Sequence, residues 1–191
     1  GVGEATTLSG VLQHMEGAID SFGFDLSWSR VAYARRWLQS QGVTGATLCT
    51  GDLFHMPFAD NSIDVVYTSH AIEPNGGGEE PILQELYRVS RKFLILLEPG
   101  FELAGAEARL RMESHGYCKD LAGKAKRLGL NVVKHELFPH AANLLNPTAI
   151  TIIRKDSASA RPAHIVACPK FKTPLEAIGE MLFSPEALVV Y

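Results

Sequence analysis

The chain has 191 residues, of which 46% are hydrophobic and 20% are charged, so it can bury one sizeable core and is expected to form one main domain. Its formal net charge of -3, with acidic and basic residues interspersed, argues against nucleic-acid and membrane-surface partners. No apolar run approaches the roughly 18 residues of a membrane-spanning helix, and three scattered cysteines (Cys49, Cys118 and Cys168) argue against a disulfide framework or a zinc site. These properties predict a cytoplasmic protein without a bound metal.

Short β-branched runs alternate with amphipathic runs along the chain, a pattern typical of βαβ units. The expected strands are residues 18–24, 46–50, 63–69, 93–98, 132–138 and 149–154. The expected helices are residues 6–15, 29–41, 80–90 and 104–128. The predicted fold class is α/β, with a Rossmann-like, doubly wound and mostly parallel sheet. This domain is expected to span residues 1–155, followed by a linker at 156–163 and a short β-rich tail at 164–191.

A glycine turn, Gly1-Val2-Gly3, opens the sequence and leads directly into a helical pattern. Such turns normally follow a buried strand, because glycine lets the backbone approach a ligand at a helix N-terminus. We therefore expect the first strand of the sheet to precede residue 1. The alternative is that the glycines are only turn or cap residues, which is the commoner role of a lone glycine pair.

Asp25 follows an expected strand, 22 residues after Gly3. A Rossmann-type unit places an acidic residue there, where its carboxylate accepts hydrogen bonds from the hydroxyls of a bound ribose. The alternative is an N-cap, since Asp25, Ser27 and Ser29 are all residue types favoured before a helix. The glycine turn in front of Asp25 favours the ribose hypothesis.

Asp52 ends the next expected strand, within the pair Gly51-Asp52. The carboxyl ends of parallel strands share one edge of a sheet, so Asp25 and Asp52 are expected to lie at the edge where ligands of open α/β folds bind. The alternative is that Gly51-Asp52 forms only a turn.

Three stretches resemble the class I S-adenosylmethionine-dependent methyltransferases, especially small-molecule enzymes of the ubiquinone and sterol methyltransferase type. They are "GVGEA", with Ala5 in place of the third glycine, "FDLSWSRVAYAR", and "GDLFHMPFADNSIDVVYTSHAIE". The resemblance covers about residues 1–155 and implies a seven-stranded sheet, whose first strand would be missing here, and a small-molecule methyl acceptor. It also implies that S-adenosylmethionine is bound by Gly1, Gly3, Asp25, Leu26, Asp52, Leu53, Ser69 and His70. Asp52 would meet the adenine amino group, while Leu53, Ser69 and His70 would offer backbone contacts.

No catalytic residue is assigned from the sequence. Methyl transfer from a sulfonium needs mainly in-line positioning of the nucleophile, and a general base is required only if the acceptor atom carries a proton of high pKa. The candidate bases are His70, Glu73, Glu98, His115 and Tyr117.

The tail "HIVACPKFKTPLEAIGEMLFSPEALVVY" resembles small zinc-ribbon-like proteins that serve as partner subunits of some methyltransferases. Phe171 stands where their second cysteine would be, so zinc binding is not expected. Its apolar residues predict a docking element, on its own domain or on a second copy in a homodimer. Two other functions stay open for the whole chain: a non-catalytic S-adenosylmethionine-binding module, and an NAD-dependent oxidoreductase, which would normally show the third glycine.

Overall fold

A computed structural model describes residues 1–16, 19–140 and 143–155. They form two compact units, the N-terminal unit of residues 2–59 and the C-terminal unit of residues 60–155 together with Gly1. The linker and tail predicted from the sequence lie outside the described residues.

The N-terminal unit contains a βαβ motif preceded by a helix. Its elements are α1 (Thr6–Gln13), β1 (Ser21–Asp25), α2 (Trp28–Ser40) and β2 (Ala46–Thr50). The two strands are parallel, with Ser21 opposite Ala46 and Asp25 opposite Thr50. Helix α2 buries Val31, Ala34 and Leu38 at helical spacing, which lets it cross over between the strands and pack against them.

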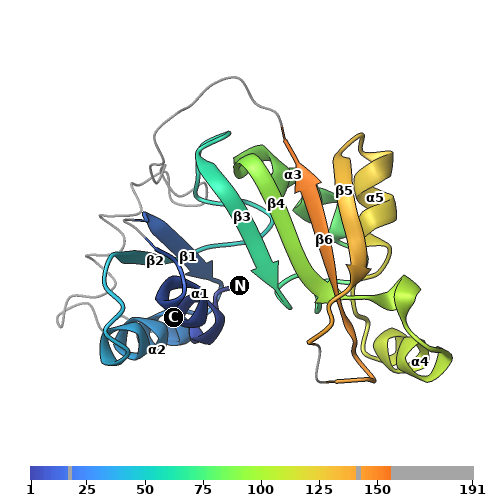
Figure 1. The fold of residues 1–191 in the computed structure, drawn as a ribbon, viewed down its shortest axis with the longest axis horizontal. Coiled ribbons are helices and arrows are strands. Elements are labelled where there is room, and N and C mark those ends of the chain that lie inside the picture. The colour runs from blue at the N-terminus through green and yellow to red at the C-terminus, as the bar shows by residue number, and fades with distance from the viewer. Residues whose placement is uncertain (17–18, 141–142, 156–191) are drawn as a thin grey trace. The chain divides into compact units, whose positions relative to one another are not determined.

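The C-terminal unit contains a four-stranded sheet in the order β3-β4-β6-β5 (Figure 1). Its strands are β3 (Ile63–Ser69), β4 (Ser90–Pro99), β5 (Asn131–Leu137) and β6 (Thr148–Arg154). Its helices are α3 (Glu79–Val89), the 3-10 helix η1 (Phe101–Leu103), α4 (Ala106–Ser114) and α5 (Leu121–Arg127). Helices α3 and α5 lie side by side behind the sheet in this view. The core between α3 and the sheet contains Ile82, Leu83, Leu86, Leu94, Leu96 and Ile153, all at most 1% exposed.

The α/β class and the mostly parallel sheet predicted from the sequence are confirmed, but one expected helix is wrong. In the C-terminal unit β3, β4 and β5 run in one direction, and among its described strands β6 alone is antiparallel to its neighbours. The helix expected at 104–128 is two helices, because Gly116 and Asp120 adopt left-handed backbone angles (φ 65° and 56°) that an α-helix cannot contain. The described residues hold six strands, against the seven that the resemblance implies for a full sheet.

A buried carboxylate joins three segments of the C-terminal unit. Glu79 is 1% exposed and lies 2.7 Å from the Lys124 amine of α5. It also accepts hydrogen bonds from the backbone amides of Gly77 (2.9 Å) and Lys119 (3.1 Å). Burial by itself would raise the pKa of Glu79, but the hydrogen bond from Lys124 and the backbone amides outweigh burial and lower it.

Replacing Lys124 by methionine should lower the free energy of unfolding at neutral pH by about 2 kcal/mol, because it removes a hydrogen bond to the charged, buried Glu79 carboxylate. Since the folded-state pKa of Glu79 is lowered, its contribution is present above the unfolded-state pKa and is lost as pH falls. The difference between wild type and K124M in urea unfolding should therefore shrink toward acid pH. Lys126→Met, at an exposed position on the same helix, is the control and should change little.

Candidate functional site

The glycine turn lies against the end of β1 within the N-terminal unit. The Val2 amide donates to the Phe24 carbonyl at 2.7 Å, which aligns the turn with the strand. The next residue, Gly3, has φ 55° and donates its amide to Asp25 Oδ2 at 2.9 Å. A side chain at Gly3 would be strained by this left-handed backbone, so the residue type fits the turn.

Asp25 is the last residue of β1 and is 7% exposed. Its Oδ1 accepts the Ser27 amide at 2.9 Å, while Oδ2 accepts the Gly3 amide. The capping role belongs to Ser27, whose hydroxyl accepts the amide of Arg30 at the start of α2. A carboxylate has about four acceptor positions, so Asp25 keeps capacity for hydroxyl donors from a ligand.

Ala5 occupies the position where the related motif has its third glycine. It is fully buried and has φ 61° and ψ 24°, the left-handed conformation that glycine adopts without cost. An alanine there costs roughly 1–2 kcal/mol relative to a right-handed backbone. The backbone therefore takes the shape of a glycine turn although the third glycine is absent.

Asp52 follows β2, the parallel neighbour of β1, so Asp25 and Asp52 lie at the same edge of this strand pair. The Gly51 amide donates to the Asp25 carbonyl at 3.0 Å and ties the two strand ends together. Asp52 Oδ1 accepts the Phe54 amide at 2.9 Å, so the turn role foreseen as the alternative is present. The Asp52 side chain is 49% exposed and stays accessible to a ligand.

The two leucines predicted to contact the cofactor follow the two aspartates. Leu26 is 75% exposed, and Leu53 is half-buried. The N-terminal unit therefore brings together Gly3, Asp25, Leu26, Asp52 and Leu53 at the carboxyl ends of β1 and β2.

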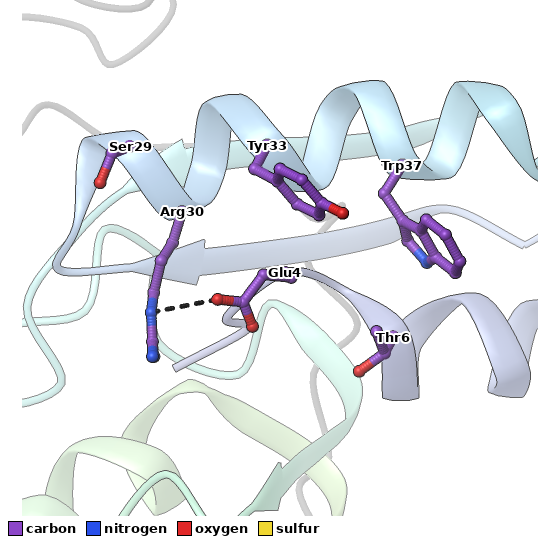
Figure 2. Close-up of a pocket in the computed structure, with 6 residues that line it drawn as sticks. All are labelled: Glu4, Thr6, Ser29, Arg30, Tyr33 and Trp37. Carbon is purple, nitrogen blue, oxygen red and sulfur yellow. Dashed lines mark ion pairs between the residues drawn. The ribbon is translucent and has the colours of Figure 1, made fainter.

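An open depression of about 540 Å³ lies in the N-terminal unit beside α2 (Figure 2). It is lined by Glu4, Thr6, Ser29, Arg30, Tyr33 and Trp37. Figure 2 shows the Arg30 guanidinium turned toward the Glu4 carboxylate, 3.4 Å away. None of the predicted cofactor residues lines this depression, and an ion pair this exposed contributes about 1 kcal/mol at most.

The predicted residues Ser69 and His70 belong to the C-terminal unit, as does Gly1. Ser69 ends β3, and the His70 amide donates to the Leu97 carbonyl of β4 at 2.9 Å. His70 has φ 53°, an uncommon backbone conformation for a residue other than glycine.

Side chains from its own loop and from two distant segments form a hydrogen-bonded cluster around His70. Its Nδ1 bonds the Glu73 carboxylate, and its Nε2 lies 2.9 Å from the Thr148 hydroxyl. Glu73 also accepts Asn146 Nδ2 at 3.2 Å. A hydrogen bond between the Tyr117 hydroxyl and the Glu73 carboxylate raises the pKa of Tyr117. His70, Glu73 and Tyr117 are candidate bases predicted from the sequence, whereas Thr148 and Asn146 were not predicted because no motif marks them.

The other two candidate bases have different surroundings. Glu98 is 1% exposed and accepts the backbone amides of Ala71, Ile72 and Glu73 at 3.0, 3.2 and 3.0 Å. Burial raises its pKa, and the hydrogen bonds oppose that effect in part. Exposed His115 follows α4, where its ring lies 5.3 Å from that of Tyr117. Glu98 therefore supports the loop that carries His70, and is itself shielded from substrate.

Metal sites and membrane-spanning helices are both absent from residues 1–16, 19–140 and 143–155. No group of three or more His, Cys, Asp or Glu side chains among them is arranged to hold a metal ion. None of the helices in this part of the chain has the length and apolar composition that a membrane crossing requires.

Comparison with known proteins identifies a similar family and similar solved structures. Residues 1–92 match a family described as a methyltransferase domain. No curated protein sequence matches the chain.

Solved structures with the same fold have low sequence identity to the chain. A putative sarcosine dimethylglycine methyltransferase from Galdieria sulphuraria has a TM-score of 0.62 and 12% identity, covering 81% of this chain and 76% of that one. Magnesium protoporphyrin IX methyltransferase from Synechocystis PCC 6803, with bound S-adenosylhomocysteine, gives 0.63 and 16%, covering 82% and 72%. A complex between the Trm112 methyltransferase activator of Haloferax volcanii and a putative methyltransferase gives 0.63 and 16%, covering 84% and 82%. The chain therefore has the Rossmann-like fold of methyltransferases.

Proposed function

We propose that the protein transfers the methyl group of S-adenosylmethionine to a small molecule, and the match of residues 1–92 to a family described as a methyltransferase domain supports this proposal. The observation that carries the proposal is the hydrogen bond from the Gly3 amide to Asp25 at the end of β1. It places a glycine turn and a carboxylate side by side at the strand edge where α/β folds bind nucleotides. The backbone keeps the left-handed conformation of a glycine turn at Ala5, where the related motif has its third glycine.

Each residue predicted to bind the cofactor has a proposed task in holding S-adenosylmethionine. Asp25 would accept the ribose hydroxyls through its remaining acceptor positions, and exposed Leu26 would pack against the adenine ring. Asp52 would accept the adenine amino group, with Leu53 offering its backbone. Gly1 and Gly3 would let the backbone approach the ligand, and Ser69 and His70 would add backbone contacts. The bound molecule supplies a sulfonium-activated methyl group.

Two of the similar structures support a small-molecule acceptor, because their names refer to sarcosine and dimethylglycine and to magnesium protoporphyrin IX. The third is bound to an activator protein. This supports our proposal that residues 164–191, which resemble small partner proteins of methyltransferases, dock on this chain or on a second copy of it.

Ligand-induced stabilisation of the full chain tests the proposal. S-adenosylhomocysteine at 100 times its dissociation constant should stabilise the folded state by about 2.7 kcal/mol and raise the melting temperature accordingly. S-adenosylmethionine should do the same, whereas NAD should have no effect. Stabilisation by NAD alone would favour the oxidoreductase alternative. Stabilisation by S-adenosylmethionine without turnover on any acceptor would favour a non-catalytic binding module.

A further inference from the structure

We propose that His70 is the general base that takes the proton from the methyl acceptor, so the acceptor is a hydroxyl or an amine. This inference rests on the proposed methyltransferase function and names the substrate class and the catalytic residue. It is carried by the hydrogen bonds around His70, all within the C-terminal unit.

The two hydrogen-bond partners of the imidazole determine which ring nitrogen carries the proton. The Glu73 carboxylate can only accept hydrogen bonds when ionised, so the neutral His70 ring carries its proton on Nδ1. Nε2 then holds a lone pair and accepts from the Thr148 hydroxyl at 2.9 Å. A hydroxyl or amine of an acceptor that takes the place of Thr148 would present its own proton to the same lone pair.

Glu73 is placed to stabilise the protonated ring. Its side chain is 14% exposed, and Asn146 and Tyr117 donate to the carboxylate from segments distant in sequence. These bonds hold the carboxylate beside Nδ1, where it favours the imidazolium that forms on proton uptake. Asn146 is 9% exposed, so its hydrogen bond to Glu73 is shielded from solvent.

The backbone of this loop is held in an unfavourable conformation by its surroundings. His70 keeps φ 53° while its amide bonds Leu97 and the next three amides bond Glu98. Such conformations cost roughly 1–3 kcal/mol and persist where many contacts over-determine them, often at functional sites. In this backbone conformation the His70 imidazole contacts Glu73 and Thr148 at the same time.

The proposed step balances in atoms and charge. A lone pair of the acceptor oxygen or nitrogen forms the bond to the methyl carbon, and the carbon–sulfur bond breaks with its electron pair remaining on sulfur. The acceptor proton moves to His70 Nε2. The positive charge of the sulfonium thus ends on an imidazolium next to Glu73, and the proton then passes to solvent.

The test combines kinetics and NMR on the full chain. Turnover with radiolabelled S-adenosylmethionine is measured on catechol, 4-nitrophenol, benzylamine and N-methylbenzylamine, with dimethyl sulfide as an acceptor that has no proton to lose. His70→Asn should lower kcat on the hydroxyl and amine acceptors by roughly 10²- to 10⁴-fold with little change in KM. Asparagine tolerates positive φ, so this variant keeps the loop conformation. The matched control is His135→Asn, since His135 also bonds a threonine hydroxyl, that of Thr151, at 2.9 Å, and this variant should leave kcat unchanged.

NMR of the wild-type imidazole decides the proposal independently of the acceptor. Nitrogen-15 shifts should show His70 as the Nδ1–H tautomer, with a far-downfield Nδ1 proton that is lost in Glu73→Gln. An Nε2–H tautomer, or an H70N variant as active as wild type, would overturn the role of His70 while leaving the proposed function intact. Failure of the proposed function would show differently, as a wild-type chain that does not bind S-adenosylhomocysteine in calorimetry.

Discussion

Replacing Glu98 by alanine should lower the free energy of unfolding by at least about 3 kcal/mol, because it leaves three backbone amides, one buried and two partly buried, without an acceptor at roughly 1–3 kcal/mol each. Those amides belong to Ala71, Ile72 and Glu73, and all three bond the carboxylate at 3.0 to 3.2 Å. Urea unfolding followed by circular dichroism measures the loss. Glu98→Gln is the matched variant, since its amide oxygen still accepts and the loss should be clearly smaller.

The difference in unfolding free energy between wild type and E98Q should depend on pH, and its sign follows from the pKa of Glu98. Burial raises the pKa of Glu98 in the folded state above its ordinary value of 4.5. The folded state then binds this proton more tightly than the unfolded chain, so the contribution is present below the unfolded-state pKa and is lost as pH rises through the folded-state pKa. Wild type should therefore lose stability relative to E98Q as pH rises above about 4.5. If E98A loses less than about 1 kcal/mol of unfolding free energy, Glu98 does not have the structural role that its three hydrogen bonds indicate.

Replacing Asp25 by alanine should weaken binding of S-adenosylhomocysteine by roughly 1.5–3 kcal/mol, which is about 10- to 150-fold in dissociation constant. The reason is the loss of hydrogen bonds from the ribose hydroxyls to a charged group. Isothermal calorimetry on the full chain measures this change.

Two comparisons separate binding from folding in that experiment. Asp25 also accepts the Gly3 and Ser27 amides, so D25A should lose some stability, and affinity must be measured well below its melting temperature. Asp20→Ala, which removes an exposed carboxylate just before β1, should leave affinity unchanged. Unchanged affinity in D25A would remove Asp25 from the proposed site.

The sequence pattern predicts an element correctly where the residues that determine it lie within one short stretch of the chain. The strands predicted at 46–50 and 63–69 have the observed bounds, because β-branched runs between turn residues leave one conformation that buries them. The spacing of 22 residues from Gly3 to Asp25 also predicted their proximity, since one helix and one strand return the chain to the same sheet edge.

The helix predicted at 104–128 failed for a local reason that the pattern concealed. Its apolar spacing continues across Gly116 and Asp120, but both residues take positive φ and end the helical path. The Asp120 amide donates a hydrogen bond to the Glu102 side chain, which partly offsets the cost of that conformation. This contact requires that η1, which contains Glu102, is folded. Antiparallel β6 between β4 and β5 could likewise not be inferred from a pattern of single strands.

The sequence by itself determined the α/β class, the glycine turn, Asp25 at its strand end and the resemblance that names a cofactor, because each depends on residues close together in the chain. Only the tertiary structure decided how His70 is used. Its partner Thr148 is 78 residues away, and Asn146 reaches Glu73 across 73 residues. Neither residue type carries a motif, and hydrogen bonds between such distant segments exist only after the sheet has closed β6 against β4. The role of Glu98 was also decided only by the tertiary structure. A glutamate in the sequence is compatible with an exposed position, but here the loop whose amides it binds buries its carboxylate.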